Sequence, residues 1–298
     1  MTITILTHHR PSTPPLKIAI LLNSYRSSFI SEIRDSYTRS ISAVSPDAQL
    51  SFFYPADHFG NDSLAFPDPD LFDLIVIGGG NVNPRKRHAW ILSVHKFILE
   101  EVVPRRKKML GICWGHQTLS MLFGGEVVDM EVPELGVTES KLTPTGTQFF
   151  SSNCSASPKR FSHSNSNSHA LETAGGQGLG GILRLQQHHR REVGTAPKGF
   201  HEILANNQSF LSHNNAILTF QGHPEKDARC AKLRIGDAAR WFQGTESGGD
   251  HAAMMGRIQR DMERQHDGAE VWRRVFEWVK EKPLAGMEVH GHGGVVHL

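Results

Sequence analysis

Apolar residues between positions 17 and 112 form short continuous runs separated by stretches of helical spacing. The runs predict buried strands, at residues 17–22, 49–54, 71–77 and 107–112. The stretches between them repeat apolar residues at close to 3.6 positions and predict helices, at residues 27–41 and 88–103. Because strands alternate with helices, we expect a parallel sheet with helices on both faces.

The rest of the chain predicts shorter strands followed by helices. The strands are expected at residues 126–128, 136–142, 182–187, 202–205 and 216–221. The helices are expected at residues 227–242, 251–266 and 269–281, the last of them strongly amphipathic. The predicted fold class is therefore α/β, with a mostly parallel central sheet flanked by helices. We expect one domain over residues 17–282.

Three segments offer little apolar surface to bury. Residues 1–16 form a polar tail rich in Thr and Pro, and residues 283–298 form a second tail that carries several histidines. Residues 151–181 are rich in Ser, Asn and Gly, which is typical of a flexible insertion. An alternative is that this insertion closes over the site as a lid.

Composition narrows the classes of partner. The net charge is +2 over 298 residues, which gives no reason to expect a nucleic acid partner. No apolar run approaches the ~18 residues that a membrane-spanning helix needs, so we expect no membrane partner. The three cysteines show no short-range pairing, which favours a reducing compartment and a cytoplasmic protein.

Cys113 stands where a strand is expected to turn sharply into a helix. It lies in the stretch Gly-Ile-Cys-Trp-Gly-His-Gln, residues 111–117, with an apolar run on each side. Small residues on both flanks let such a turn pack closely and expose the nucleophile. Since a helix N-terminus favours an anion, we expect the position to lower the pKa of the thiol.

A base and a carboxylate follow a later strand. Residues 221–225 read Gln-Gly-His-Pro-Glu after an apolar run. Pro224 disfavours a helical conformation at the residue before it, and alternate residues of an extended segment project to the same side. We therefore expect His223 and Glu225 to face Cys113 together, as general base and orienting carboxylate.

Backbone donors for a developing oxyanion are also expected. The N–H of Trp114, the residue after the nucleophile, is one candidate, and Gly79 or Gly80 in the glycine run at residues 78–80 is another. A phosphate-binding loop is the alternative for that run, but it lacks the full dinucleotide spacing and a Walker lysine. No His-Glu-x-x-His or paired Cys-x-x-Cys occurs, so we expect no metal and no cofactor.

These motifs together resemble the class I glutamine amidotransferases. That family has the elbow G-x-C-x-G-H-Q and the second motif G-H-P-E, and the chain matches them at residues 111–117 and 222–225. The resemblance implies a flavodoxin-like fold with Cys113, His223 and Glu225 as its catalytic triad. It further implies that Gln117 helps to hold the glutamyl substrate. It also implies that His189 belongs to the substrate-binding part of the site, because His189 matches a histidine that follows a strand in the family.

A particular branch of this family fits best, the stand-alone γ-glutamyl peptidases and related proteins. The resemblance to that branch lies in residues 89–91, 107–112 and 188–193. Only 73 residues remain after Glu225, too few for a fused synthetase. We therefore predict a thiol hydrolase that cleaves a small-molecule γ-glutamyl amide through a cysteine thioester.

Two alternatives remain open. The first is a glutaminase subunit that supplies ammonia to a separate synthetase. The second is a family member redirected to amide or acyl chemistry on a specialised metabolite, with Trp114 and the insertion reshaping the pocket.

Overall fold

The computed structural model describes residues 14–58, 62–151, 179–236, 241 and 248–284. A seven-stranded sheet forms its centre, in the order β2-β1-β3-β4-β9-β8-β7. These strands are β1 (Lys17–Asn23), β2 (Gln49–Phe53), β3 (Leu74–Gly80), β4 (Lys108–Ile112), β7 (Phe200–Leu204), β8 (Ser209–Ser212) and β9 (Ile217–Phe220). The first five in spatial order are parallel, and β8 and β7 continue the sheet antiparallel. The predicted mostly parallel sheet is confirmed.

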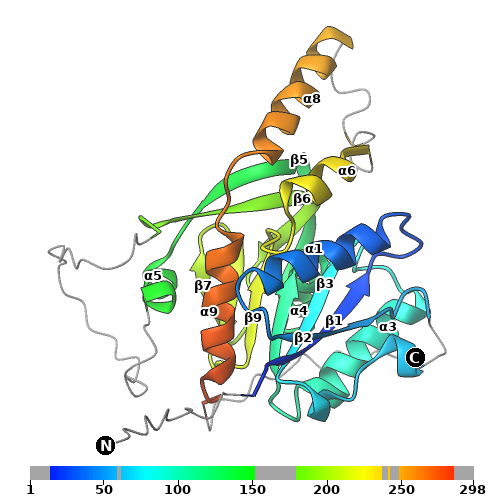
Figure 1. Cartoon of the computed structure of the whole chain (residues 1–298), viewed down its shortest axis with the longest axis vertical. Coiled ribbons are helices and arrows are strands. Elements are labelled where there is room, and N and C mark those ends of the chain that lie inside the picture. The colour runs from blue at the N-terminus through cyan, green and yellow to red at the C-terminus, as the bar shows by residue number, and fades with distance from the viewer. Residues whose placement is uncertain (1–13, 59–61, 152–178, 237–240, 242–247, 285–298) are drawn as a thin grey trace, which may run out of the picture.

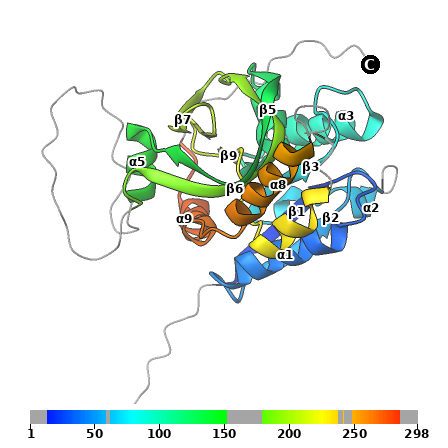
Figure 2. The ribbon, with the colours of Figure 1, turned by 90° about the horizontal axis from the view of Figure 1, so that it is seen from above.

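Helices cover both faces of this sheet (Figures 1 and 2). One face carries α1 (Ile30–Ser42) and α9 (Gly268–Lys280), and the other carries α3 (Ala89–Lys96) and α4 (Trp114–Leu122). Alternate residues of β3 are buried on opposite faces of the sheet. Leu74 and Val76 belong to the core cluster under α1 and α9, and Ile75 and Ile77 belong to the cluster under α3 and α4. A strand buried on both faces needs such a continuous apolar run.

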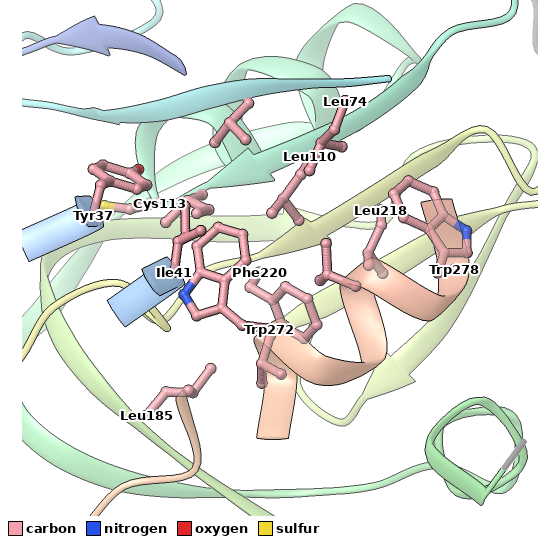
Figure 3. Close-up of a cluster of buried hydrophobic side chains, with 14 of the residues drawn as sticks. Tyr37, Ile41, Leu74, Leu110, Cys113, Leu185, Leu218, Phe220, Trp272 and Trp278 are labelled. Atoms are coloured by element: carbon pink, nitrogen blue, oxygen red, sulfur yellow. The ribbon is translucent and has the colours of Figure 1, made fainter. Parts of the chain in front are cut away.

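The core beneath α9 gathers large side chains (Figure 3). Trp272 is fully buried, lies edge-on to Tyr37 of α1 at 6.5 Å between ring centroids, and stacks on Phe276 at 5.8 Å. The sulfur-bearing side chain of Cys113 borders the same cluster. The packing that holds α1 and α9 on the sheet is thus continuous with the surroundings of the predicted nucleophile.

A second sheet of two antiparallel strands lies beside the first. Its strands are β5 (Glu126–Lys141) and β6 (Ile182–Thr195), and α8 (Gly248–Met262) packs against β5 (Figure 1). Residues 126–128 and 136–142 were predicted as separate strands, but they belong to β5, whose pairing with β6 is irregular between Asp129 and Glu134. The predicted strand at residues 182–187 is extended to Thr195.

The remaining elements differ from the prediction in detail. Strand β3 starts at Leu74 because Pro69–Leu71 form the short turn η1, capped by the Asp68 carboxylate. The helix predicted at residues 88–103 is α3 followed by η2 (Phe97–Val102), a π-helical stretch. Strand β8, α2 (Asp62–Ala65) and α5 (Pro144–Ser151) were not predicted, and of the helix predicted at residues 227–242 the structure describes α6 (Ala228–Leu233).

Some predictions fall on residues that the structure does not describe. These are most of the insertion at residues 151–181 and most of both tails. The limits of the single domain at residues 17 and 282 stay a prediction. Within the part of the chain that is described, no helix has the length and apolar character needed to cross a bilayer.

Trp272→Ala should lower the free energy of unfolding by ~3–5 kcal/mol, because it removes a large, fully buried side chain between α9 and α1. Urea unfolding followed by tryptophan fluorescence and circular dichroism measures the change. Leu71→Ala is the control, since Leu71 is 62% exposed and its truncation should change stability by less than about 0.5 kcal/mol. Equal effects of the two substitutions would contradict this account of the core.

Candidate active site

The carboxyl ends of β3, β4 and β9 meet at one edge of the sheet. Ile112 and Phe220 are register partners, and the N–H of Cys113 donates to the Phe220 carbonyl at 2.8 Å. Cys113 directly follows β4, and His223 follows β9 after two further residues. The parallel topology therefore brings together segments that are more than a hundred residues apart in the sequence.

Cys113 occupies a strained backbone conformation. Its φ is 52° and its ψ is −100°, in the left-handed half of the map that side chains rarely adopt. A Cβ on Gly115 would overlap the carbonyl oxygen of Ile77, and one on Gly111 would lie 2.6 Å from the Leu119 side chain. Glycine at position 115 lets α4 start close to β3, and glycine at position 111 lets it pack closely on β4. The predicted elbow is present, and its strain is typical of functional sites.

His223 and Glu225 form a buried pair. The distance between His223 Nδ1 and Glu225 Oε1 is 2.6 Å, and the two residues are 3% and 4% exposed. His223 Nε2 has no hydrogen-bond partner among the described residues. A Cβ on Gly79 would lie 3.0 Å from the His223 ring and 3.9 Å from the Cys113 Cβ, so the thiol and the imidazole flank the same glycine.

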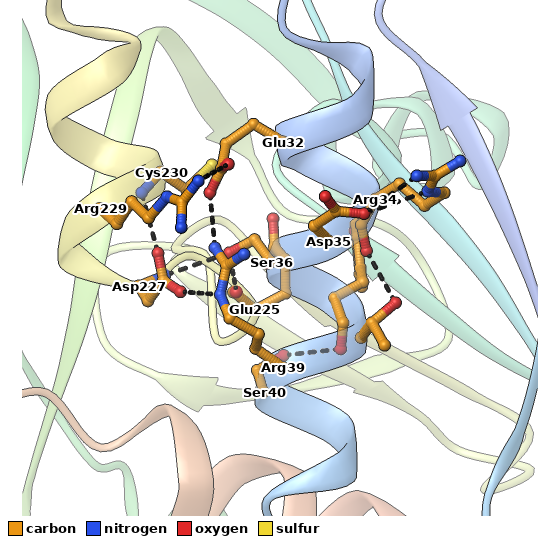
Figure 4. A network of polar contacts seen from close by, with 12 residues as sticks. Glu32, Arg34, Asp35, Ser36, Arg39, Ser40, Glu225, Asp227, Arg229 and Cys230 are labelled. Carbon is orange, nitrogen blue, oxygen red and sulfur yellow. Dashed lines mark hydrogen bonds and ion pairs between the residues drawn. The ribbon is translucent and has the colours of Figure 1, made fainter.

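Helix α1 fixes the segment that carries this pair (Figure 4). Ser36 Oγ donates to the carbonyl oxygen of Glu225 at 2.7 Å and accepts the N–H of Asp227 at 3.3 Å. Asp227 in turn binds Arg39 at 2.7 Å and caps α6 by accepting the N–H of Cys230. The backbone N–H of His223 donates to Gln186 of β6 at 2.8 Å. Contacts on both sides therefore hold His223 and Glu225 in place.

Burial sets the protonation of the site. It raises the pKa of the Cys113 thiol, although Lys226, Arg234 and the Trp114 N–H act in the opposite direction. The expectation that the helix N-terminus lowers this pKa is wrong, because desolvation of the buried sulfur outweighs the dipole. Burial and the charge of Lys226 lower the pKa of His223 to about 4.

The carboxylate remains ionised. Burial acts to raise the pKa of Glu225, but its interaction with His223, which includes a hydrogen bond, and the charge of Lys226 outweigh burial and lower that pKa. At neutral pH the site therefore holds a thiol, a neutral imidazole and a carboxylate. The imidazole donates from Nδ1 to Glu225, which leaves Nε2 as an acceptor.

The expected oxyanion donors lie beside the thiol. The Trp114 N–H acts to lower the pKa of the Cys113 thiol, and a Cβ on Gly79 near the end of β3 would lie 3.9 Å from the Cys113 Cβ, with Gly80 following it. The indole of Trp114 is 1% exposed and stacks on Trp90 at 5.6 Å, within the core on the far face of the sheet. Trp114 is not among the cavity-lining residues, but its ring packs behind Gly80, which is, so its influence on the shape of the pocket stays a prediction.

A cavity of ≈ 230 Å³ opens above Cys113, Gln117, His189 and His223. It is smaller than the ~300–1,000 Å³ of sites for drug-sized ligands, which suits a small acyl group. Gln117 donates from its side chain to the Arg191 carbonyl at 2.7 Å and to the Gln221 side chain at 3.1 Å. Its position is thus fixed at the base of α4.

His189 lies inside β6 rather than after a strand. The prediction placed it after residues 182–187, but pairing with β5 continues through it. Its Nδ1 lies 3.1 Å from the Arg191 carbonyl oxygen, and its Nε2 lies 3.1 Å from both Gln187 and Glu134. His189 borders the cavity as predicted, with its ring held by neighbours on the same sheet.

Sequence reasoning missed several charged residues at the site. Lys226 is 2% exposed, and its Nζ has no hydrogen-bond partner among the described residues. Burial lowers the pKa of Lys226 to about 8. Arg234, at the end of α6, lines the cavity and is 8% exposed. A lysine directly after the His-Pro-Glu segment was a signal available in the sequence, whereas nothing local marked Arg234.

Metal binding finds no support within the described residues. No group of three or more histidine, cysteine or acidic side chains there could hold an ion. The histidines of the C-terminal tail lie outside the described part of the chain.

The family model and the curated relatives that match this chain both point to the glutamine amidotransferases. The family model described as glutamine amidotransferase class-I matches residues 35–236. The chain is 27% identical over 276 residues to the glutamine amidotransferase-like protein chyE of Penicillium rubens, which covers 91% of this chain and 99% of that protein.

Two further relatives cover less of the chain. A glutamine-hydrolysing GMP synthase subunit of Sulfurisphaera tokodaii is 27% identical over 161 residues, which covers 52% of this chain and 68% of that protein. Gamma-glutamyl peptidase 5 of Arabidopsis thaliana is 27% identical over 173 residues, which covers 54% of this chain and 57% of that protein.

A solved structure supports the fold. A glutamine amidotransferase from Thermotoga maritima superposes with a TM-score of 0.60 at 17% identity, covering 89% of this chain and 99% of that chain. The likeness agrees with the predicted fold class.

Lys226→Met should slow alkylation of Cys113 by iodoacetamide about tenfold at pH 7, because it removes a cation that lowers the pKa of this thiol. The difference from the unsubstituted protein should shrink above pH 8, where Lys226 itself loses its proton. Mass spectrometry of the Cys113 peptide measures the rate. The control is Lys232→Met, on the exposed side of α6 and paired with Glu263. A pH-independent difference would indicate altered packing instead.

Proposed function

The chain belongs to the class I glutamine amidotransferase family, and on that premise we propose that it is a cysteine amidohydrolase that cleaves a γ-glutamyl amide without a fused synthetase. The buried His223–Glu225 pair carries the proposal, since Nε2 of His223 has no partner among the described residues and His223 lines the same cavity as Cys113. The relationship to a γ-glutamyl peptidase supports the choice of bond.

The first half-reaction forms a thioester. His223 Nε2 takes the proton of the Cys113 thiol as the sulfur attacks the amide carbon. The N–H groups of Trp114 and of Gly79 or Gly80 stabilise the resulting oxyanion. His223 then gives its proton to the departing nitrogen, the carbon–nitrogen bond breaks, and an amine or ammonia leaves. Glu225 keeps the imidazole in the required tautomer and stabilises it while it is protonated.

The second half-reaction reverses these roles. Water enters where the amine has left, and His223 takes one of its protons as the oxygen attacks the thioester carbon. The carbon–sulfur bond breaks, the thiolate recovers the proton from His223, and the glutamyl acid is released. Gln117 and His189 are proposed to hold the acyl group. No cofactor is needed for either step.

A neutral resting pair suits this mechanism. The proton rests on the sulfur, and it moves to Nε2 of His223 as the bond to carbon forms. We also propose the cytoplasm as the location, because Cys113 and Cys230 are free thiols and such a nucleophile needs a reducing compartment.

A glutaminase subunit that serves a separate synthetase is the second candidate. The similarity to the GMP synthase subunit of Sulfurisphaera tokodaii favours it. A partner that co-purifies and raises the rate of glutamine hydrolysis would support this candidate over the first, whereas full activity of the isolated chain would count against it. The third candidate is a hydrolase or acyltransferase that acts on the amide of a specialised metabolite. Intact-mass measurement after mixing the protein with different acyl donors would identify the acyl group that Cys113 accepts.

Cys113→Ala should abolish hydrolysis of γ-glutamyl amides, with a loss on the order of 10³-fold or more, because no other group can form the acyl bond. Rapid quenching in acid and intact-mass measurement should show a glutamyl adduct on the unsubstituted protein and none on the variant. Cys230→Ala, which removes the other free thiol among the described residues, should keep the adduct. An adduct on Cys113→Ala would refute the assignment.

The acid limb of kcat/KM should lie near pH 4 rather than near 6.5, because burial and Lys226 lower the pKa of His223 to about 4. Below that pH Nε2 binds a proton and can no longer accept one from the thiol, so activity falls as pH decreases. Initial rates between pH 3.5 and 8, with stability checked at each pH, measure the limb. A midpoint near 6.5 would contradict a buried, neutral base.

A further inference from the structure

Arginines dominate the charge around the cavity. Four of them line it: Arg26 in the turn after β1, Arg190 and Arg191 in β6, and Arg234 at the end of α6. Aspartate and glutamate are absent from the described residues that line it. Cations from three separate segments of the chain thus converge on the space above Cys113.

Two cations near the cavity, Arg191 and Lys226, have buried nitrogen atoms without a hydrogen-bond partner among the described residues. Arg191 has its Nε buried without a hydrogen-bond partner among the described residues, and burial and the charge of Arg190 lower its pKa. Lys226 lies behind the site, and its Nζ is likewise unpartnered within the described part of the chain. Asp129, the register partner of Arg191 on β5, forms an ion pair with Arg85, and Glu225 is engaged by His223. The inner wall therefore carries positive charge with donors available for an anion.

The rim of the cavity is held in position as well. Arg26 has a left-handed φ of 49°, its N–H donates to Asp57 at 3.0 Å, and its guanidinium lies 5.0 Å from the centre of the Tyr25 ring. Strain of this kind persists where surrounding contacts enforce it and is typical of ligand-binding turns. Ser27, Ser28 and Asn81 add neutral hydrogen-bonding groups beside it.

A free glutamyl head does not match this charge. Its carboxylate and its ammonium cancel, and the ammonium would enter a cavity bordered by guanidinium groups. Like charges repel, and the repulsion is stronger beside a partly buried guanidinium than in water. A second carboxylate would instead find planar guanidinium groups that bind carboxylates through paired hydrogen bonds.

We propose that the acyl donor is an anionic γ-glutamyl-type amide that carries a second carboxylate, bound by the arginines of β6 and of the turn after β1. The proposal rests on the proposed function and specifies its substrate class. The second carboxylate has two possible locations, the amine half of the substrate or a substituent on the α-nitrogen, which would also remove the ammonium charge.

A substrate series tests the proposal. γ-Glutamyl methylamide is the zwitterionic reference, γ-glutamylglycine adds a carboxylate to the amine half, and Nα-succinyl-γ-glutamyl methylamide adds one to the acyl half. At least one dicarboxylate should show kcat/KM tenfold or more above the reference. This advantage should decrease as salt is raised, because exposed charges are screened. Which dicarboxylate is preferred identifies the half that carries the second carboxylate.

Two substitutions connect the preference to the arginines. Arg191→Gln should reduce the ratio of kcat/KM between the preferred dicarboxylate and the reference at least tenfold, and Arg191→Lys should restore part of it. Arg26→Gln, on the exposed rim, should also reduce this ratio, and it provides a second test if the β6 variant folds poorly. Arg273→Gln is the control, because Arg273 pairs with Glu270 on α9 away from the cavity.

The outcomes separate the two proposals. Equal kcat/KM for the zwitterionic and dicarboxylate compounds, with a thioester on Cys113, would overturn the substrate class and leave the amidohydrolase intact. The absence of both hydrolysis and adduct with every compound would overturn both. A preference that survives both Arg191→Gln and Arg26→Gln would refute the role of these arginines.

Discussion

The close approach of α4 to β3 is the constraint on which the site depends. Gly115 contacts the backbone of Ile77 where no Cβ fits, so the helix begins immediately after β4 and Cys113 must take a left-handed conformation. That turn directs the thiol out of the sheet edge and places the Trp114 N–H beside the sulfur. The strain of about 1–3 kcal/mol at Cys113 is sustained because the sheet on one side and α4 on the other are both rigidly packed.

Burial and nearby cations both change the pKa values of Cys113 and His223, and at Cys113 they act in opposite directions. Burial disfavours the thiolate and the imidazolium alike, which leaves a neutral pair in the resting site. Lys226 and Arg234 favour the thiolate but disfavour the imidazolium, so they support the sulfur as a nucleophile while weakening His223 as a base. Glu225 opposes them at His223 through the 2.6 Å contact with Nδ1. The balance keeps both the thiol and the imidazole neutral in the resting site.

Local signals in the sequence predicted the elements and the reacting groups well. The continuous apolar runs identified β1 and β4 because strands covered on both faces need them, and the spacing of residues 111–117 identified the elbow because its glycines are sterically obligatory. Properties that arise from packing were not predictable. Whether β5 and β6 join the central sheet depends on pairing across the fold, and the desolvation of Cys113 and the convergence of Arg26 with Arg191 depend on segments far apart in the chain.

The charge of the cavity connects substrate choice to catalysis. In the free site, burial lowers the pKa of His223, and the charges of Lys226 and Arg234 lower it further, to a value at which it is a weak base. A carboxylate bound among the arginines would cancel part of their field and raise that pKa, since a neighbouring anion favours the imidazolium. The bound substrate would thereby strengthen the base at the moment when it must accept the thiol proton. A zwitterionic substrate would leave the field nearly unchanged. Selectivity for an anion would therefore act on the rate of acylation as well as on binding.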